Sequence, residues 1–467
     1  MTIQSINPAT EELVAAFEEF TEQQLDQALE RAALAFERWR RVSFAERSRL
    51  MTGAAGHLRE HKPRLAGLIT AEMGKPIVEA EAEIEKCAWN CDFYAENAEQ
   101  FLAAKSISSG ARQSYVAFEP LGPVLAIMPW NFPFWQVFRF ASPVIMAGNT
   151  ALLKHASNVS QCALAIEDVF RAAGFPAGVL QTLLTSGPAA ESLIQDNRIR
   201  AVTLTGSDST GSKVGGAGGR ALKKCVLELG GSDPFIVLAD ADLQAAAETG
   251  VRARNQNTGQ SCIAAKRFVV VETVADEFER RFIDGVTKLR VGDPMKRETQ
   301  IGPLARDDLR DAIEGQVRRS VEQGARAAIG GDRMEGKGYF FAPTVLTGVT
   351  TEMPAAGEET FGPVAAVIRA RDTDEAIAIA NDSQFGLGAS LWTRDIERAR
   401  SLASAVQAGS VFINGMVASD PRLPFGGIKR SGYGRELSEF GIREFVNIQT
   451  VWIGPATGPT TALPPVE

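Results

Sequence analysis

The fold of this 467-residue chain is decided by Ala201-Val202-Thr203-Leu204-Thr205-Gly206-Ser207-Asp208-Ser209-Thr210-Gly211. The apolar first half predicts a strand buried on both faces, and the glycine-spaced second half predicts the start of a helix. Backbone N–H groups at such a helix start suit a phosphate. The stretch lacks a full G-x-G-x-x-G pattern, and Ser212-Lys213 reverses the P-loop order, so this binding signal is weak by itself.

Apolar runs alternate with helical patterns on both sides of this stretch. Upstream we expect strands at 124–128, 151–153 and 179–184, with helices at 134–146 and 159–173. Downstream we expect strands at 235–238, 268–271, 364–368, 389–392 and 411–414, and helices at 242–254, 274–289, 373–380 and 396–406. This repetition predicts an α/β fold with parallel sheets covered by helices, and ligands beyond the carboxyl ends of the strands.

The two ends of the chain differ from this middle region. The first hundred residues read as helices, with capping boxes at Thr21 and Ser43 and a third helix from Pro76 to about Phe101. Residues 445–453 predict a late strand. The chain is too long for a single core, and we expect a domain boundary near 227–231.

Composition restricts the class of protein. Five scattered cysteines indicate a reducing compartment rather than a disulfide framework. A net charge of -8 argues against nucleic acid or an anionic membrane as the main partner. The N-terminus shows no signal peptide, and apolar runs are far shorter than the ~20 residues of a spanning helix. We therefore expect a soluble, cytoplasmic enzyme.

Cys262 is the candidate nucleophile. It closes the segment Asn257-Thr258-Gly259-Gln260-Ser261-Cys262, where glycine permits close approach to the backbone. A helix starting near Ser261 would lower the pKa of the thiol through its N-terminal field. The alternative is a small buried hydrophobic residue, the common state of an intracellular cysteine.

A carboxylate and an amide complete the candidate catalytic set. The chain has only three histidines, which disfavours a Cys-His hydrolase and leaves a carboxylate as the base. Glu228, between two leucines and followed by two glycines, fits a base whose pKa is raised by burial; a solvated strand-end glutamate is the alternative. Asn131, held between prolines and aromatic residues in 129–133, fits a rigid oxyanion donor, with a turn-forming asparagine as the alternative.

Two metal-like patterns do not predict a metal site. His57-Leu58-Arg59-Glu60-His61 matches an H-x-x-E-H zinc pattern but lies in a polar helix tail without a further ligand. Cys87 and Cys91 stand one helical turn apart and are expected to be packing residues. We expect no metal.

Six motifs together resemble the aldehyde dehydrogenase superfamily over roughly residues 6–453. They are Pro129-Trp130-Asn131-Phe132-Pro133, Thr205-Gly206-Ser207, Leu227-Glu228-Leu229-Gly230-Gly231, Gly259-Gln260-Ser261-Cys262, Glu358-Glu359-Thr360-Phe361-Gly362-Pro363 and Pro424-Phe425-Gly426-Gly427. Within that superfamily, residues 152–158, 230–235 and 425–437 resemble the succinate-semialdehyde dehydrogenase branch. The resemblance implies oxidation of succinate semialdehyde to succinate, with another acidic or aliphatic aldehyde, such as glutarate semialdehyde, as the alternative substrate.

The resemblance implies a role for each motif. Cys262 attacks the aldehyde, Asn131 and the Cys262 N–H hold the oxyanion, and Glu228 activates water to release the acid. The cofactor site comprises Trp130, Lys154, Ser157, Gly206, Ser207, Glu359 and Phe361. Relatives that prefer NAD often carry glutamate where this chain has Ser157. Serine removes the repulsion of a 2′-phosphate, so we expect NADP as the preferred cofactor, with NAD as the alternative.

The resemblance also indicates the substrate site and the domains. Arg139 matches a carboxylate-binding arginine, with a surface helix residue as the alternative; Ser419, Trp135 and Phe425 are expected beside it, and Arg422 is a weaker candidate. Ala264 stands where some relatives carry a second cysteine, so we expect no redox-switch disulfide. A cofactor-independent cysteine hydrolase and a binding protein without turnover are the other classes considered.

Four divisions of the chain are expected. Residues 1–227 form a Rossmann-type cofactor-binding domain, and residues 228–433 form an α/β catalytic domain. Residues 434–453 form a return helix and a strand that, with residues 110–121, builds a small β oligomerisation element. Residues 454–467 form a flexible tail. The resemblance implies a homodimer or homotetramer.

Overall fold

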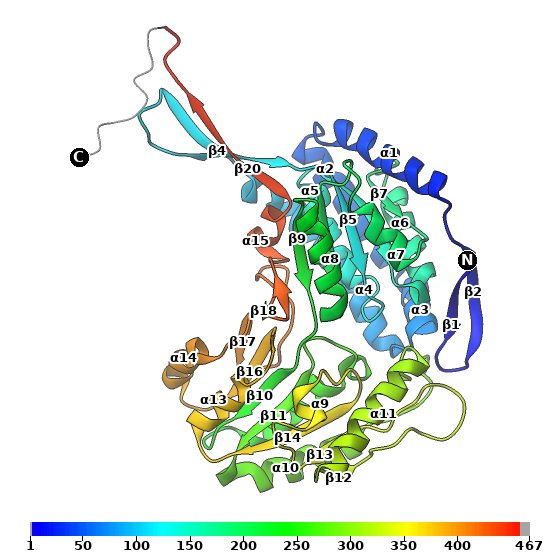
Figure 1. Cartoon of the computed structure of the whole chain (residues 1–467), viewed down its shortest axis with the longest axis vertical. Coiled ribbons are helices and arrows are strands. Elements are labelled where there is room, and N and C mark those ends of the chain that lie inside the picture. The colour runs from blue at the N-terminus through cyan, green and yellow to red at the C-terminus, as the bar shows by residue number, and fades with distance from the viewer. Residues whose placement is uncertain (1, 458–467) are drawn as a thin grey trace.

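The computed structural model describes residues 2–457, and two parallel sheets with helices packed against them form its body (Figure 1). The first sheet has the order β19-β9-β8-β5-β6-β7. Its strands are β5 (Pro123–Met128), β6 (Thr150–His155), β7 (Leu180–Thr182), β8 (Ala201–Thr205), β9 (Lys224–Glu228) and the short antiparallel β19 (Gly432–Tyr433). The predicted α/β class and the deciding strand at 201–204 are confirmed.

The strand order reverses beside β5 in the first sheet. The chain runs from β5 to β6 and β7 on one side, then crosses to β8 and β9 on the other. A ligand of an open parallel sheet binds at such a switch point, beyond the strands' carboxyl ends. Residues 129–131 leave β5 at that edge, and residues 206–207 leave β8 beside them.

The second sheet has the order β12-β13-β14-β11-β10-β16-β17. Its strands are β10 (Asp233–Val237), β11 (Ala265–Val271), β12 (Arg326–Ile329), β13 (Thr344–Thr347), β14 (Val364–Ala370), β16 (Gly388–Trp392) and β17 (Ser410–Ile413). All neighbours are parallel except β12 and β13. The chain passes from the first sheet to the second between Glu228 and Asp233, and Cys262 lies just before β11.

Helices cover the sheets and match most of the predicted ranges. Those of the first half are α1 (Glu22–Trp39), α2 (Phe44–Glu60), α3 (Lys62–Met73), α4 (Ile77–Phe101), α5 (Trp135–Met146), α6 (Ser160–Ala172), α7 (Gly187–Leu193) and α8 (Asp208–Arg220). Those of the second half are α9 (Leu243–Asn255), α10 (Glu272–Thr287), α11 (Asp307–Glu322), α12 (Pro354–Gly357), α13 (Thr373–Asn381), α14 (Ile396–Ala405) and α15 (Ser438–Arg443). Helix α5 is buried along its whole length, packs on β6 and brings its first turn to the switch point.

The capping predictions differ in outcome. Thr21 forms a full capping box with Gln24 at the start of α1. Ser43 accepts from the Glu46 N–H, but the Glu46 side chain bonds to Arg49 instead of returning to the cap, so only half of that box forms. The first hundred residues are not all helical, because β1 (Thr2–Asn7) and β2 (Glu12–Glu18) form an antiparallel hairpin.

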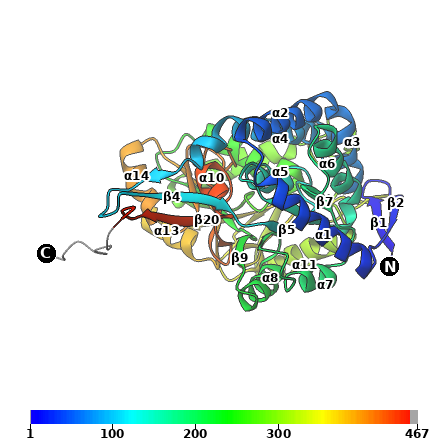
Figure 2. The same cartoon turned by 90° about the horizontal axis from the view of Figure 1, so that it is seen from above.

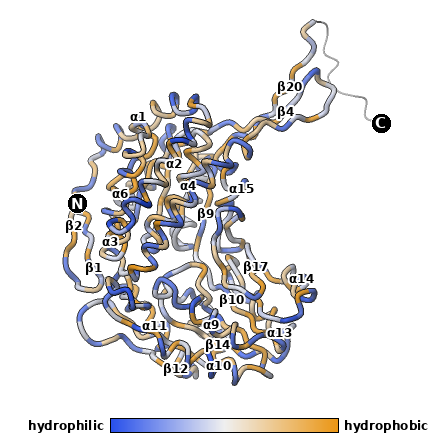
Figure 3. The backbone as a smooth tube through the Cα atoms, turned by 180° about the vertical axis from the view of Figure 1, so that it is seen from behind, coloured by the Kyte–Doolittle hydropathy of each residue, from blue (hydrophilic) through white to orange (hydrophobic). Residues whose placement is uncertain are grey.

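A long ribbon stands clear of the body (Figures 1 and 3). Its strands are β4 (Gln113–Pro120) and β20 (Val446–Ile453), paired antiparallel along eight residues each, with β3 (Lys105–Ser106) on the other edge of β4. In the view from above, the ribbon points away from the N-terminal hairpin (Figure 2). The late strand at 445–453 is confirmed.

Two further features complete the fold. Strands β15 (Phe385–Gly386), between β14 and β16 in sequence, and β18 (Ile428–Lys429), between β17 and β19, form a small antiparallel pair. Residues 454–457 belong to no helix or strand, and residues 458–467 of the expected tail lie outside the described residues. Among residues 2–457, no helix is both long enough and apolar enough to cross a membrane.

Candidate active site

Cys262 lies on a strained loop, and no helix starts at Ser261. Residues 256–259 form a short 3-10 turn in which Asn257, Thr258 and Gly259 all have positive φ, at 56°, 55° and 72°. Residues 261–264 then lead directly into β11. The helix start on which a lowered thiol pKa would depend is therefore not formed, because three left-handed residues cannot begin a right-handed helix.

Buried side chains from outside the loop hold its shape. Arg254 donates to the Gly259 carbonyl at 2.6 Å and to the Ala265 carbonyl at 3.2 Å. Lys266 donates to the carbonyls of Ser261 and Cys262 at 2.9 and 2.8 Å. A buried cation on each side thus satisfies carbonyl groups that the missing helix leaves unpaired.

The loop has no room for a side chain at Gly259. A Cβ there would lie 2.5 Å from the Gly362 carbonyl carbon and 2.7 Å from Arg254 Nη2, and nearer still to the Gly362 oxygen. The positive φ disfavours any other residue independently of that contact. Glycine is required here for both reasons.

The Cys262 thiol is not activated in this state. Burial raises its pKa to about 12, although the charges of Arg139 and Lys266 act in the opposite direction. The expectation of a thiol pKa lowered by a helix terminus is therefore wrong, because the loop supplies carbonyls and burial rather than aligned N–H groups.

One cavity, the strand-end cavity, lies at the switch point of the first sheet and measures about 350 Å³. It is lined by Pro129, Trp130, Asn131, Gln136, Thr205, Gly206, Ser207, Leu229, Gly230, Cys262, Arg306, Leu309, Glu359 and Phe361. Five of the seven residues expected at a cofactor therefore meet in one space. Lys154 and Ser157 do not line this cavity; they lie at the end of β6 and just beyond it, half-buried and exposed respectively.

The strand-end cavity has the features of a dinucleotide site. Ser207 caps the N-terminus of α8, so that the following N–H groups face the end of β8. Gly230 leaves space for Glu359, whose Oε2 would lie 2.5 Å from a Cβ there. Trp130 and Phe361 meet edge to face with centroids 5.7 Å apart. Backbone donors, a carboxylate and aromatic surface are the groups that phosphates, ribose hydroxyls and a flat ring require.

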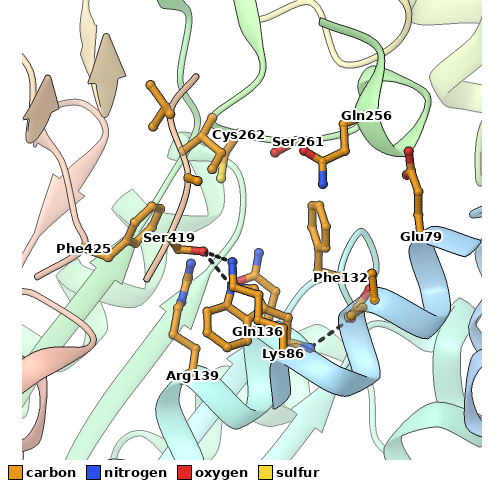
Figure 4. A pocket seen from close by; sticks show the side chains of 16 residues that line it. Glu79, Lys86, Phe132, Gln136, Arg139, Gln256, Ser261, Cys262, Ser419 and Phe425 are labelled. Atoms are coloured by element: carbon orange, nitrogen blue, oxygen red, sulfur yellow. Dashed lines mark hydrogen bonds between the residues drawn. The ribbon is translucent and has the colours of Figure 1, made fainter. Parts of the chain in front are cut away.

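A second cavity, the α4–α5 cavity, measures about 170 Å³ and reaches the other side of Cys262 (Figure 4). It is lined by Glu79, Ala82, Glu83, Lys86, Phe132, Trp135, Gln136, Arg139, Gln256, Ser261, Cys262, Ile263, Val417, Ala418, Ser419 and Phe425. All four residues expected at the substrate are among them. Arg422 is not; it is exposed and bonds to Asp420.

Arg139 is buried and already has partners. Its guanidinium forms an ion pair with Glu436, approaches Thr205 Oγ1 at 3.3 Å and lies 4.5 Å above the Phe425 ring. It is therefore not the surface residue considered as the alternative. Its charge is balanced by a carboxylate of its own.

Lys86 was missed in the sequence. It follows Glu79 and Glu83 at helical spacing on α4, which places all three on one face, and that face lines the α4–α5 cavity. Lys86 Nζ donates to Ser419 Oγ at 2.8 Å and lies 4.4 Å from the Trp135 ring. The spacing was visible, but a charged residue on a long helix usually faces solvent.

Asn131 and Glu228 occupy different positions relative to the cavities. Asn131 is buried in the strand-end cavity and donates to the Gln260 carbonyl at 3.1 Å, which ties it to the cysteine loop. Glu228 lines neither cavity. Its carboxylate has no hydrogen-bond partner among the described residues and lies so close to Gly426 that a Cβ there would be 2.7 Å from Oε1. Burial raises the pKa of Glu228 well above its usual range, and the charge of Glu436 raises it further.

The dismissed zinc pattern does gather at the surface. The potential ligand atoms of His57, Glu60 and His61 lie within 4.8 Å of one another, and none of these residues lines either cavity. The five cysteines are all free thiols.

Comparison with known proteins gives one family. A family model described as the aldehyde dehydrogenase family matches residues 1–451. The chain is 50% identical over 456 residues to "Succinate-semialdehyde dehydrogenase [NADP(+)] 1" of Mycobacterium bovis, covering 97% of this chain and all of that one. It is 49% identical to "Succinate semialdehyde dehydrogenase [NAD(P)+] Sad" of Escherichia coli, covering 96% and 97% of the two chains. A crystal structure of succinic semialdehyde dehydrogenase from Streptococcus pyogenes with NADP+ superposes with a TM-score of 0.95 at 36% identity, covering 97% of this chain and 100% of that chain.

Proposed function

The chain belongs to the aldehyde dehydrogenase family, and from that premise we propose that it oxidises succinate semialdehyde to succinate with NADP as its preferred cofactor. One observation carries the proposal: Cys262 lines both cavities. A sulfur at that junction is open to a cofactor from one side and to an aldehyde from the other. The lysine and the arginine in the lining of the second cavity, Lys86 and Arg139, suit an aldehyde that carries a carboxylate.

We assign the covalent chemistry to Cys262. Its sulfur adds to the aldehyde carbon to give a thiohemiacetal, and loss of hydride from that carbon leaves a thioester. When bound, the nicotinamide dinucleotide supplies the hydride acceptor. The Asn131 amide and the Cys262 N–H are the donors assigned to the oxyanion, and the bond from Asn131 to Gln260 supports this because it keeps the amide beside the loop.

We assign release of the acid to Glu228. Burial raises its pKa, so the carboxylate, once ionised, is a stronger proton acceptor than an exposed glutamate. Because the carboxylate lines neither cavity, this role requires rotation of the side chain toward Cys262. The lack of a hydrogen-bond partner in its present position makes that rotation inexpensive.

The proposed cofactor site fits this chain's residues. Gly206, Ser207, Trp130, Glu359 and Phe361 would hold the pyrophosphate, ribose and nicotinamide portions. Lys154 and Ser157, beyond the strand-end cavity, would meet the adenosine ribose. A lysine without an adjacent carboxylate at 157 accommodates a 2′-phosphate, and relatives named for NADP support that preference.

The proposed assembly uses the ribbon. Strand β20 presents Ile448, Trp452 and Ile453 with 62%, 44% and 40% of their surface exposed, more apolar area than an isolated edge strand normally leaves open. We propose that a second copy covers this edge, giving a homodimer or a homotetramer. We also propose domain boundaries at 227/228 and 433/434. We propose a cytoplasmic location for the protein.

Initial rates test the function. Succinate semialdehyde, glutarate semialdehyde and hexanal are each assayed with NAD and with NADP. The proposal expects the highest kcat/KM for succinate semialdehyde with NADP. A higher kcat/KM for hexanal would refute the acidic substrate, and ester cleavage without any aldehyde oxidation would indicate a hydrolase instead.

A further inference from the structure

The α4–α5 cavity contains two cations, and they differ in what neutralises them. Arg139 is paired with Glu436. Lys86 has no carboxylate within ion-pair distance among residues 2–457. The two acidic groups nearest to it are committed elsewhere: Glu83 pairs with Lys75, and Asp420 pairs with Arg422. Lys86 is half-buried, and a cation withdrawn this far from water is normally paired, so its missing counter-ion is a feature that a ligand can supply.

Ser419 adds a donor beside that cation. Its oxygen accepts from Lys86 Nζ at 2.8 Å and from Trp135 Nε1 at 3.1 Å. Both acceptor positions of the hydroxyl are thereby used, which leaves its own hydrogen to be donated. An ammonium and a hydroxyl hydrogen side by side are complementary to the two oxygens of one carboxylate.

The arrangement across the cavity fits a short molecule with two different ends. Cys262 lies at one end, and Lys86, Ser419 and Arg139 face it from the other, as Figure 4 shows. Phe132 and Trp135 also line the cavity, with Trp135 beside Lys86, and their rings suit a methylene chain. The aldehyde carbon would reach the sulfur while the distal carboxylate replaces the missing counter-ion.

We propose that Lys86, with Ser419, is the principal group that binds the substrate carboxylate, and that Arg139 chiefly orders the site through Glu436. The inference rests on the proposed function and specifies its substrate recognition. Lys86 also has a depressed pKa of about 8, because burial and the charge of Arg139 lower it, while Asp420, Glu83 and the Cys87 thiol act in the opposite direction. Glu79 lines the same cavity, and burial raises its pKa to about 7, so its ionisation also disfavours an anion as the pH rises. Carboxylate binding should therefore weaken as the pH rises through the range of both groups, from about 7 to above 8.

The test compares Lys86→Met with Lys86→Arg. Each is assayed with succinate semialdehyde and with butanal, which has the same carbon chain but no carboxylate. Loss of a charge-assisted pair should lower the kcat/KM of Lys86→Met for succinate semialdehyde about 30- to 100-fold through KM, with the value for butanal unchanged or higher. Lys86→Arg should recover most of the loss and should move the alkaline rise of KM to higher pH. Exposed Lys296 provides the matched control, since Lys296→Met should change neither substrate.

The outcomes separate this inference from the proposed function. If the wild-type enzyme uses butanal as well as succinate semialdehyde, the acidic substrate itself is wrong. If the wild type discriminates and Lys86→Met discriminates equally, the function stands and the assignment to Lys86 is overturned. A melting temperature and an NADP affinity, measured by fluorescence, that are both close to wild type would show that Lys86→Met is folded. If Lys86→Met is not folded, Lys86→Ala is the second variant.

Discussion

Gly259→Ala is the sharpest test of how the cysteine loop is built. Alanine at φ 72° costs about 1–2 kcal/mol in backbone conformation. The added Cβ also overlaps the Gly362 carbonyl and Arg254, and overpacking of this kind costs about 1–3 kcal/mol. The expected loss of unfolding free energy is therefore about 2–5 kcal/mol, unless the loop moves to relieve it.

Movement of the loop would appear as lost activity instead. Arg254 fixes the Gly259 carbonyl three residues before the nucleophile, so displacement there is transmitted to Cys262. A misplacement of about 1 Å at a reacting group costs on the order of 100-fold in rate. Gly259→Ala should thus lower the melting temperature, kcat/KM, or both.

Gly56→Ala is the matched control. Gly56 lies within α2, and an added Cβ there meets nothing within 4 Å. Alanine in a helix interior should stabilise the protein by about 0.5–1 kcal/mol, opposite in sign to Gly259→Ala. Scanning calorimetry and steady-state rates are measured on both variants. A Gly259→Ala enzyme with wild-type melting temperature and wild-type kcat/KM would refute the account of the loop.

Four further outcomes are expected. Cys262→Ala should abolish aldehyde oxidation while retaining cofactor binding, and measurable turnover would exclude the sulfur as nucleophile. Glu228→Gln should give a rapid burst of reduced cofactor followed by slow acyl release, whereas unaffected steady-state turnover would contradict the assignment. Ser157→Glu should lower the ratio of NADP to NAD use, and an unchanged ratio would refute the selectivity argument. Alkylation of free Cys262 by iodoacetamide should accelerate about tenfold per pH unit from pH 7 to 10, since its pKa is about 12; a plateau near pH 8 would show a lower pKa.

The strands that could be predicted from the sequence are those whose own residues show that they are buried. Strands β5, β8 and β11 are buried almost throughout, so the apolar residues at 124–128, at 201–204 around Thr203, and at 268–271 predict strands. The hairpin β1–β2 was missed because one of its buried positions is polar: Ser5 faces inward and donates to the Asn158 carbonyl at 3.1 Å. A serine satisfied by a distant carbonyl breaks the apolar alternation that predicts a strand.

The candidate site also contains residues that local motifs identified and residues that depend on distant contacts. Cys262, Asn131 and Arg139 were identified from local motifs, and the structure brings all three to the cavities. Lys86 was not identified, because Ser419, its one side-chain hydrogen-bond partner among residues 2–457, is 333 positions away. The conformation of the cysteine loop could not be predicted either. Its carbonyl groups accept hydrogen bonds from two buried cations on neighbouring elements instead of from the N–H groups of a helix.

The resting site is arranged so that reactivity depends on what enters it. Burial opposes the Cys262 thiolate, while the positive charges of Arg139 and Lys266 favour it but act more weakly. Further exclusion of water by an uncharged ligand would raise the thiol pKa again, whereas a ligand that adds positive charge beside the sulfur would lower it. Glu228 follows the same rule, because burial and Glu436 disfavour its charged form while Arg139 and Arg435 favour it. Nucleophile and base thus share Arg139 as a common electrostatic neighbour, so a substitution at Arg139 should disturb both steps, while a substitution at Lys86 should disturb mainly binding.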